Sequence, residues 1–406
     1  MSEAEFDWFV GIDWASREHE VRLLDGQGQD CGRRAVPHSG PGLEALADWL
    51  VEQCGGQPQR VAVAIEVTRG PIVESLLARG IAVFGVNPKQ LDRLRDSYTV
   101  AGAKDDRLDA FVLADTLRTS RSLYRRLKLG DPKLIALRAL VESVEELEAE
   151  ERRLANRLRA ILESYYPQIL AVCPAVDEAW IWSVLERAPT PADVRRLTKA
   201  RLAKILREHR IRRLDASDIL HTLREQAIRV APGAAEAAGG QVVLLTARLR
   251  LTHSQRARCS RQVEAALAEL EDEPDGDAAI VRSLPGVGAG VSAALLVDAA
   301  DLLADRDYRG LRSYAGIAPV TRRSGRSHLV VMRRACSSRL REALYHWARC
   351  SVQRSAHFRA IYAAARGRGQ SHGRALRGLA DRLLRMLVGM LKSKTRYNPE
   401  RLPVPA

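Results

Sequence analysis

The alternation of apolar and polar positions in the first 125 residues predicts strands separated by helices. Apolar runs typical of strands occupy residues 8–13, 19–25, 61–66 and 81–86. Helical spacing occurs at about 41–54 and 71–79, and it resumes at about 106. Two early strands joined by a short polar connection, then strands that alternate with helices, form a mixed sheet covered by helices. We therefore expect an α/β domain of the ribonuclease-H-like (RuvC-like) kind over residues 1–125.

Residues 133–165 show a different pattern, with apolar side chains at three- and four-residue spacing. The spacing predicts a long coiled-coil helix with Glu151 at its one polar seam position, and its stripe is Leu137, Leu140, Val144, Leu147, Leu154, Leu158 and Ile161. A second long helix at about 240–273 has a weaker stripe of Val242, Leu245, Leu249, Cys259, Val263, Ala266 and Leu270. Thr252 and Arg256 interrupt that second stripe. We expect the two helices to pair as an antiparallel stalk.

These patterns divide the rest of the chain into two further parts. Residues 126–274 are expected to form the coiled-coil region, with a helical insertion at about 167–235 that Pro and Gly interrupt. The acidic run EDEPDGD at 271–277 marks the next boundary. Residues 275–406 are expected to form an all-α domain.

The positive charge of the chain is concentrated near its C-terminal end. The net charge is +14, yet residues 321–400 alone hold 19 Lys and Arg against 3 Asp and Glu. Surfaces that only aid solubility normally mix both signs. Clustered cations gain binding free energy when they release counterions from phosphates, so the distribution indicates a nucleic-acid partner.

Cysteine spacing and the N-terminal residues exclude several other classes of protein. The six cysteines form no CxxC pair and no Cys/His cluster at zinc spacing, so we expect neither structural zinc nor a disulfide framework. The N-terminus is acidic, and no apolar run approaches the length of a membrane span. We expect a cytoplasmic protein without a membrane partner.

Four carboxylates in the N-terminal part are candidate metal ligands. Asp13 and Glu66 end apolar strands, and Asp106 and Asp109 lie three residues apart on a helix, where they share a face. Acids at the ends of buried strands are costly unless a positive group meets them. Metal ions held by such oxygens would meet them and would activate phosphoryl transfer. The alternative is that Asp13 and Glu66 are acids of turns while Asp106 and Asp109 suit a helix N-terminus.

Two motifs in the C-terminal part are candidates for phosphate contact. LPGVGAGVSAALL at 284–296 is similar to a helix-hairpin-helix, in which Gly286, Gly288 and the following helix offer N–H groups to a phosphate. An ordinary turn between helices is the alternative. Ser324 is a candidate nucleophile in RRSGRS, because guanidinium groups stabilise a phosphoryl transition state; the flanking cations are Arg322, Arg323 and Arg326. A serine that only hydrogen-bonds phosphate is the alternative, and Ser327 is its rival.

Short motifs at both ends of the chain are typical of one known family. Those in the N-terminal part are GID at 11–13, AIE at 64–66 and KDDRLDA at 104–110. Those in the C-terminal part are PGVG at 285–288, YAGIAP at 314–319, the Ser-Gly pair at 324–325 and RRACSSRLREAL at 333–344. In these motifs the chain resembles, nearly from end to end, the DEDD transposases of the insertion-sequence family numbered one hundred and ten, relatives of the pilin-gene invertases. This chain departs from the family in one place: Arg334 and Ala335 are followed by Cys336 and Ser337, so the glycine and asparagine that the family has there are missing.

The resemblance implies a specific activity. Asp13, Glu66, Asp106 and Asp109 would be the Mg²⁺-binding RuvC-like tetrad, and Ser324 the nucleophile. The chain would be an RNA-guided recombinase of a prokaryotic insertion sequence, acting at the nucleoid. A structured noncoding RNA would pair with donor and target DNA. Dimers would form a tetramer in which strands are exchanged through a phosphoserine intermediate, with the serine supplied by a partner subunit.

Two other functions remain open from the residues alone. A RuvC-like structure-specific endonuclease would hydrolyse DNA junctions with the carboxylates and would need neither serine nor RNA. A helix-hairpin-helix scaffold would bind nucleic acid without chemistry. Of the three functions, only the serine recombinase requires a covalent protein–DNA adduct.

The charge distribution gives a first prediction. We expect duplex DNA affinity to fall steeply with salt, because each neutralised phosphate adds about 0.9 to the slope of log affinity against log salt. Filter binding or fluorescence anisotropy between about 50 and 200 mM salt measures the slope. A slope near zero would contradict a phosphate-binding role for the basic region.

Overall fold

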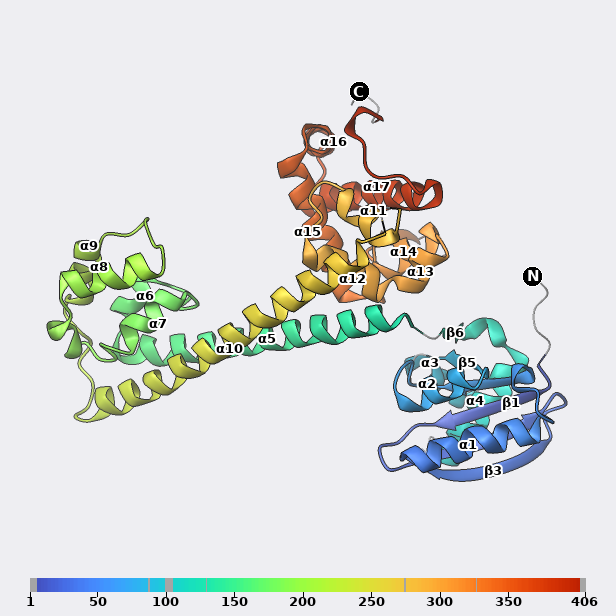
Figure 1. Cartoon of the computed structure of the whole chain (residues 1–406). Helices are drawn as coiled ribbons and strands as arrows, with labels where there is room; N and C mark the ends of the chain where they lie inside the picture. Colours follow the sequence, from blue (N-terminus) through green and yellow to red (C-terminus); the bar gives the residue numbers. More distant parts are fainter. Residues whose placement is uncertain are drawn as a thin grey trace. The chain divides into compact units, whose positions relative to one another are not determined.

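The computed structural model describes residues 6–86, 88–98, 105–128, 130–273, 275–325 and 327–401. The chain divides into two compact units, Met1–Asp131 and Pro132–Ala406. Each unit is described by itself (Figure 1). The finer boundary near residue 274 stays a prediction. Within the described residues, no helix has the length and apolar content needed to cross a membrane.

The first unit is a six-stranded mixed sheet in the order β3-β2-β1-β4-β5-β6. The strands are β1 (Trp8–Asp13), β2 (Glu18–Asp25), β3 (Asp30–Pro37), β4 (Val61–Ile65), β5 (Ala82–Gly85) and β6 (Arg125–Arg126). β1, β4 and β5 are parallel to one another, whereas β2, β3 and β6 pair antiparallel with their neighbours. This arrangement confirms the mixed α/β sheet expected from the sequence and is compatible with a ribonuclease-H-like fold. β3, which lacks clear alternation, was not predicted.

Helices cover both faces of this sheet. They are α1 (Gly40–Gln53), α2 (Pro71–Ala78), α3 (Pro88–Arg95) and α4 (Asp106–Thr119). Val10 and Ile12 of β1 pack in one core with α1 and α2. Phe9, two residues from Gly11, packs in a second core with α4. Because side chains alternate along a strand, Phe9, Gly11 and Asp13 all point to the α4 side.

Gly11 allows α4 to lie directly on β1. A Cβ atom at this position would overlap the carbonyl oxygen of Ala110 and lie 2.6 Å from the backbone nitrogen of Ala114. Ala110 and Ala114 are themselves small residues spaced four apart on one helix face. The helix therefore touches the strand through backbone atoms, which fixes its height above the sheet.

In the second unit, α5 (Pro132–Tyr165) and α10 (Ala234–Leu270) pack against each other. They run antiparallel, because Leu137 shares a core with Val263 and Leu267 while Leu158 shares another with Val242 and Leu249. The buried positions agree with the predicted stripes only in part: the partly buried members are Leu140, Val144, Leu147, Ile161, Cys259, Ala266 and Leu270. Leu162 and Leu267, which lie outside the stripes, are buried, and so is Thr252, which was predicted to interrupt the second one. A helix of 3.6 residues per turn drifts away from a strict seven-residue stripe. Coiled-coil geometry itself stays a prediction.

Two helical subdomains pack on opposite ends of this pair. The insertion contains α6 (Gln168–Val172), α7 (Ala179–Leu185), α8 (Lys199–Glu208) and α9 (Ala216–Leu223). The C-terminal part contains α11 (Asp277–Ser283), α12 (Ala289–Asp298), α13 (Ala300–Ala304), α14 (Tyr308–Tyr314), α15 (Ser338–Arg354), α16 (Ala356–Gly367) and α17 (His372–Ser393). Short 3-10 turns occur at Pro58–Arg60, Arg121–Leu123, Asp193–Arg196 and Pro399–Arg401.

The expectation of an all-α C-terminal domain is wrong in one place. β7 (Val320–Ser324) and β8 (Ser327–Val331) form an antiparallel hairpin inside it. The segment has β-branched residues on either side of a Ser-Gly turn, which favours a hairpin. Arg322 and Arg323 interrupt the β-branched pattern and so conceal this signal in the sequence.

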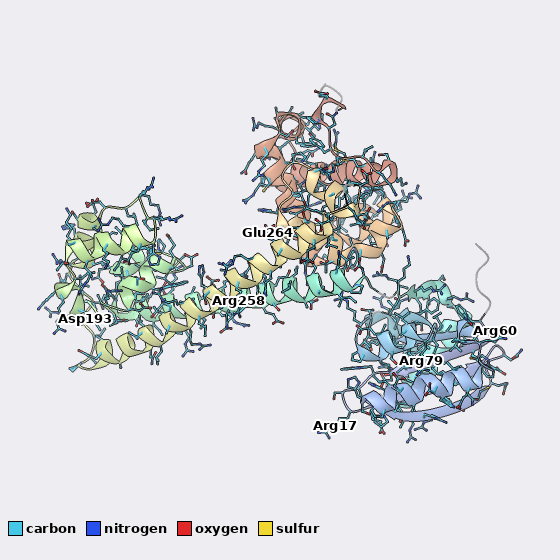
Figure 2. All side chains as sticks on the ribbon, in the orientation of Figure 1. Arg17, Arg60, Arg79, Asp193, Arg258 and Glu264 are labelled. Atoms are coloured by element: carbon cyan, nitrogen blue, oxygen red, sulfur yellow. The ribbon has the colours of Figure 1, made fainter. Side chains whose placement is uncertain are left out.

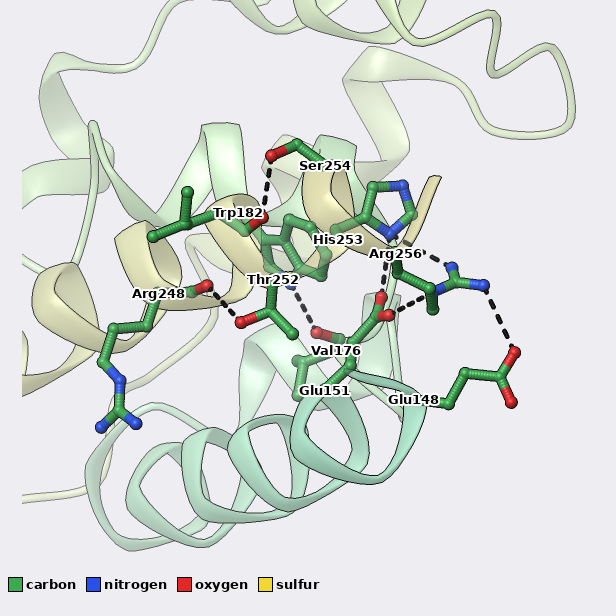
Figure 3. Close-up of polar contacts among 10 residues, drawn as sticks. Glu148, Glu151, Val176, Trp182, Arg248, Thr252, His253, Ser254 and Arg256 are labelled. Carbon is green, nitrogen blue, oxygen red and sulfur yellow. Dashed lines mark hydrogen bonds and ion pairs between the residues drawn. The ribbon is translucent and has the colours of Figure 1, made fainter. Parts of the chain in front are cut away.

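The polar interruptions of the two long helices meet each other. Arg256 Nε donates to Glu151 Oε2 at 2.6 Å, and His253 Nδ1 lies 2.8 Å from Glu151 Oε1 (Figure 3). The His253 ring also lies edge-on to Trp182 of α7. Farther along α10 come Arg258 and then Glu264, which forms an ion pair with Arg282 of α11 at 3.4 Å (Figure 2). The charge of the seam acid expected at Glu151 is thus compensated by Arg256 of α10.

The contact at Gly11 gives a prediction about stability. Gly11→Ala should lower the free energy of unfolding of the first unit by about 1–3 kcal/mol, because the new methyl group forces α4 off the strand. Denaturant unfolding, with hydrogen exchange of β1 and α4 peptides, measures the effect. Gly40→Ala is the matched control, since its Cβ would meet nothing within 4 Å. Equal stability of Gly11→Ala and wild type would contradict the direct contact.

The ion pair between Glu151 and Arg256 gives a second prediction about stability. Arg256→Leu should destabilise the helix pair by about 1–3 kcal/mol, because Glu151 loses its closest donor in a largely buried position. The double variant Glu151→Leu with Arg256→Leu should recover most of that loss, because an apolar pair can replace a buried ion pair. Thermal and urea unfolding compare the three proteins. A double variant less stable than the single one would show that the seam needs the charge.

Candidate functional site

Asp13 and Glu66 lie side by side at the carboxyl ends of two parallel strands. Gly11 pairs with Ala64 and Ile12 with Ile65, so the next positions along the two strands are Asp13 and Glu66. Both follow the alternation of the α4 face. Asp13 is buried and Glu66 is half-buried. The structure therefore brings together two of the four predicted acids.

The first turn of α4 supplies the other two, with different exposure. Asp105 caps the helix, and its side chain accepts a hydrogen bond from the Arg107 N–H at 3.1 Å. Asp106 is exposed, whereas Asp109 is only 1% exposed. The two acids therefore do not point equally toward the sheet. The close contact at Gly11 holds the turn that carries Asp109 over the end of β1.

A cation that the sequence analysis missed contacts Asp109. Arg95, the last residue of α3, donates through Nη2 to Asp109 Oδ2 at 2.8 Å and through Nε to Asp109 Oδ1. Hydrogen bonding to Asp109 raises the pKa of Arg95, and attraction to Asp92 and Asp13 adds to this effect. No sequence motif marks Arg95, but the rule that a buried acid needs a positive partner predicts such a group.

The acids suit a hard cation by chemistry, yet they are not drawn together around one. Carboxylate oxygens are the ligands that Mg²⁺ prefers. Among the described residues, however, no three His, Cys, Asp or Glu side chains are grouped closely enough to hold an ion. The donor set fits Mg²⁺, and Arg95 engages both oxygens of its most deeply buried member.

Two histidines lie near the Asp13 end of β1. His19 is fully buried on β2, and its Nε2 lies 2.9 Å from His38 Nδ1. Its Nδ1 accepts from the Ala15 N–H at 3.3 Å. Burial lowers the pKa of His19, and the neighbouring His38 lowers it further. The lowered pKa favours the neutral form of His19, and the hydrogen bond from Ala15 helps to fix the loop that follows Asp13.

Ser324 lies at the exposed end of the β7–β8 hairpin. It pairs with Ser327 across the hairpin, and Gly325 has φ of +54°. The left-handed backbone is the one that glycine adopts without strain. Paired residues share a face, so the Ser324 and Ser327 hydroxyls lie on the same side. The sequence hypothesis for Ser324 and its rival Ser327 are thus placed next to each other.

The predicted arginines around Ser324 are divided between the two faces of the hairpin. Arg322, two residues before Ser324, shares its face, whereas Arg323 pairs with His328 on the other face. Both arginines are exposed. Arg326 lies outside the described residues.

Arg333 and Arg334 follow the hairpin, where the chain packs onto α14. The Ser337 N–H donates to the Tyr314 carbonyl at 2.8 Å, and Ser337 caps α15. A Cβ on Gly316 would lie 2.6 Å from the Cys336 Sγ. Cys336 and Ser337 therefore form the base of the hairpin.

The PGVG turn connects α11 to α12. Gly286 has φ of +83°, and a Cβ there would lie 2.7 Å from the Ser351 nitrogen on α15. Trp347 Nε1 and Ser351 Oγ both donate to the Pro285 carbonyl, at 3.1 and 2.8 Å. Gly288 caps α12, and a Cβ there would meet nothing within 4 Å. Gly286 therefore allows the turn to pack against α15, whereas Gly288 has open space beside it.

Comparison with known proteins covers both candidate sites. Residues 10–167 match the profile of a family described as transposase, of the DEDD type of IS110. Residues 278–363 match a second profile, described as transposase IS116/IS110/IS902 family. The first match contains the acids and the second contains Ser324 and the PGVG turn.

Full-length relatives agree with these matches. A Streptomyces coelicolor protein named as the transposase for the mini-circle element IS117 is 32% identical over 100% of this chain and 99% of its own. The 43.6 kDa protein of insertion element IS110, also from Streptomyces coelicolor, is 30% identical over 97% and 96%. A Sinorhizobium fredii protein named as a transposase is 44% identical, over 51% of this chain and 58% of its own length. The chain therefore belongs to the IS110 family of transposases.

Proposed function

We propose that this transposase is an RNA-guided DNA recombinase that exchanges strands through a phosphoserine intermediate. The observation that carries the proposal is Ser324, an exposed hydroxyl at a glycine turn with Arg322 on the same face. Ser324 Oγ would attack the phosphorus of one strand. The P–O bond of that strand would break, and the freed hydroxyl end would leave. A hydroxyl end of another strand would then attack the phosphoserine and release Ser324.

The acids of the first unit would complete the site. Asp13, Glu66, Asp106 and Asp109 would hold Mg²⁺, which supplies positive charge to the phosphate oxygens when bound. Asp13 and Glu66 are fixed by neighbouring strands, which favours a defined ligand position. Asp106 is exposed and would need to turn toward the sheet to join them. In the proposal, the serine that meets these acids comes from a partner subunit of a tetramer built from dimers.

The nucleic-acid surface would lie in the C-terminal part. Arg322, Arg323, Arg326, Arg333 and Arg334 would contact phosphates of donor and target DNA. The N–H groups at the start of α12, next to Gly288, would bind a phosphate in the manner of a helix-hairpin-helix. A structured guide RNA is supported by the family resemblance and by the excess of basic residues over 321–400.

The serine assignment gives a test that separates recombination from hydrolysis. On a nicked suicide substrate, the wild-type chain should form a covalent adduct that survives denaturation. Ser324→Ala should form none and yield no recombinant product, because the attacking oxygen is absent. It should still bind DNA, since Arg322 and Arg323 remain. Mass spectrometry of the trapped peptide identifies the attachment site.

Ser327→Ala is the matched control. It removes the cross-strand partner of Ser324 from the same face and should leave adduct formation within about threefold of wild type. An adduct on Ser327, or one that persists in Ser324→Ala, would contradict the assignment. Strand cleavage without any adduct would favour a metal-dependent endonuclease of the RuvC-like kind.

A further inference from the structure

Arg95 occupies the position at which a bound cation would be most needed. Asp109 is almost completely buried, and an unpaired carboxylate there would be very unfavourable. The Arg95 guanidinium engages both of its oxygens. Such two-point contact is the strongest geometry between arginine and a carboxylate. The buried acid therefore has its counter-ion from within the chain.

We propose that Arg95 is an internal counter-ion that competes with the divalent cation for Asp109. The inference rests on the proposed metal-binding role of Asp13 and Asp109. Without metal, Arg95 neutralises Asp109 and keeps its carboxylate at the end of β1. A divalent cation binds fully only when Arg95 leaves, so metal loading and the release of Arg95 are one event.

Arg95 and a divalent cation exclude each other for an electrostatic reason. Both Asp109 oxygens already accept from the guanidinium, so an ion that binds them must displace these donors. Two cations held close together near a protein surface repel each other, because the surroundings screen their charges less than bulk water does. The repulsion is larger for a doubly charged ion. Occupancy by one therefore lowers the affinity of the other.

A second acid is ready to receive Arg95 when it leaves Asp109. Asp92 lies one turn earlier on α3, with its Oδ1 3.6 Å from Arg95 Nη2. Its side chain is 66% exposed, whereas that of Asp109 is 2% exposed. Rotation of one side chain would move the guanidinium from the buried acid to the exposed one.

α3 does not need to undock for this exchange. Leu91 is buried in the core that α4 shares with the sheet, and Leu94 packs against the same core. Tyr98 donates to Asp115 of α4 at 2.6 Å. These contacts hold α3 against α4 on either side of Arg95. The exchange is therefore confined to the Arg95 side chain.

The contact between Arg95 and Asp109 therefore keeps the acidic site stable before a divalent cation binds. Acids gathered for a metal repel one another when the metal is absent. Arg95 removes much of that repulsion at Asp109 and keeps the first turn of α4 in place. The divalent cation then binds more weakly, because only the fraction of molecules in which Arg95 has left Asp109 can bind it fully.

The test measures cation binding rather than activity. Mn²⁺ binding to the full chain is followed by electron paramagnetic resonance, with Mg²⁺ as competitor. Arg95→Gln should bind Mn²⁺ about tenfold more tightly, because the competing charge is gone. Asp92→Asn should bind about two- to fivefold more weakly, because the displaced arginine loses its second partner. The two substitutions on one helix thus have opposite effects.

Arg79→Gln is the matched control. Arg79 also bridges two acids, Glu44 and Asp48, but on the side of the sheet covered by α1 and α2 (Figure 2). Its loss should leave Mn²⁺ affinity unchanged. In the absence of metal, Arg95→Gln should also lower the melting temperature, and Mg²⁺ should raise it more than in wild type. Arg95→Lys, which keeps the charge without the two-point contact, should bind Mn²⁺ between wild type and Arg95→Gln.

The outcomes separate this inference from the proposed function. Mn²⁺ binding that Asp13→Asn abolishes, but that is unchanged or weaker in both Arg95→Gln and Arg95→Lys, would overturn the competition and leave the metal site standing. Equal Mn²⁺ binding by wild type and Asp13→Asn, or no binding by either, would overturn the metal site and the competition together. Hydrogen exchange of β1 and α4 confirms that each variant is folded.

Discussion

The direct contact of α4 with β1 at Gly11 fixes the geometry on which the acidic site depends. The missing side chain lets the backbone of Ala110 and Ala114 lie against the strand. Asp109 precedes Ala110, and Asp13 follows Gly11 by two residues, so the same contact sets the position of both acids. A larger residue at Gly11 would lift the whole first turn of α4. The neighbouring strand then adds Glu66 through its register with β1.

The two candidate sites are built on opposite principles. Asp13 and Glu66 lie at the ends of buried strands, Asp109 lies on the first turn of α4, and Arg95 balances the charge of Asp109. Ser324 is exposed at the end of a two-stranded hairpin, and the base of that hairpin is packed through Gly316, Cys336 and Ser337. In the proposed function, a buried acidic site that opens to bind a cation and an exposed serine supplied by a partner subunit would be complementary. Neither alone carries out the proposed strand exchange.

Local patterns predicted the elements that a single segment determines. Strand alternation located β1, β2, β4 and β5, and helical spacing located α5 and α10. The polar seam position Glu151 and the interruption Arg256 were both visible in the sequence, but only the antiparallel alignment paired them. Asp13 and Glu66 were recognised because each ends an apolar run. These features depend on residues close together in the chain.

Features set by distant segments were not predicted. Arg95 meets Asp109 because α3 packs on α4, and α3 lacks a clear apolar pattern. The different exposure of Asp106 and Asp109 depends on how α4 meets the sheet, which spacing alone does not give. The hairpin that carries Ser324 was concealed by its arginines. In the same way, the packing of Gly286 on α15 could not be foreseen from the PGVG motif.

The central claim is that the serine of one subunit acts with the acids of another on the same phosphate. Mixing Asp13→Asn protein with Ser324→Ala protein before assembly on guide RNA and DNA tests it most directly. Each variant alone should give no recombinant, and the mixture should give recombinant product, because a mixed assembly contains one intact acidic site and one intact serine that can meet. A mixture that binds DNA and forms mixed oligomers but yields no recombinant would contradict the claim.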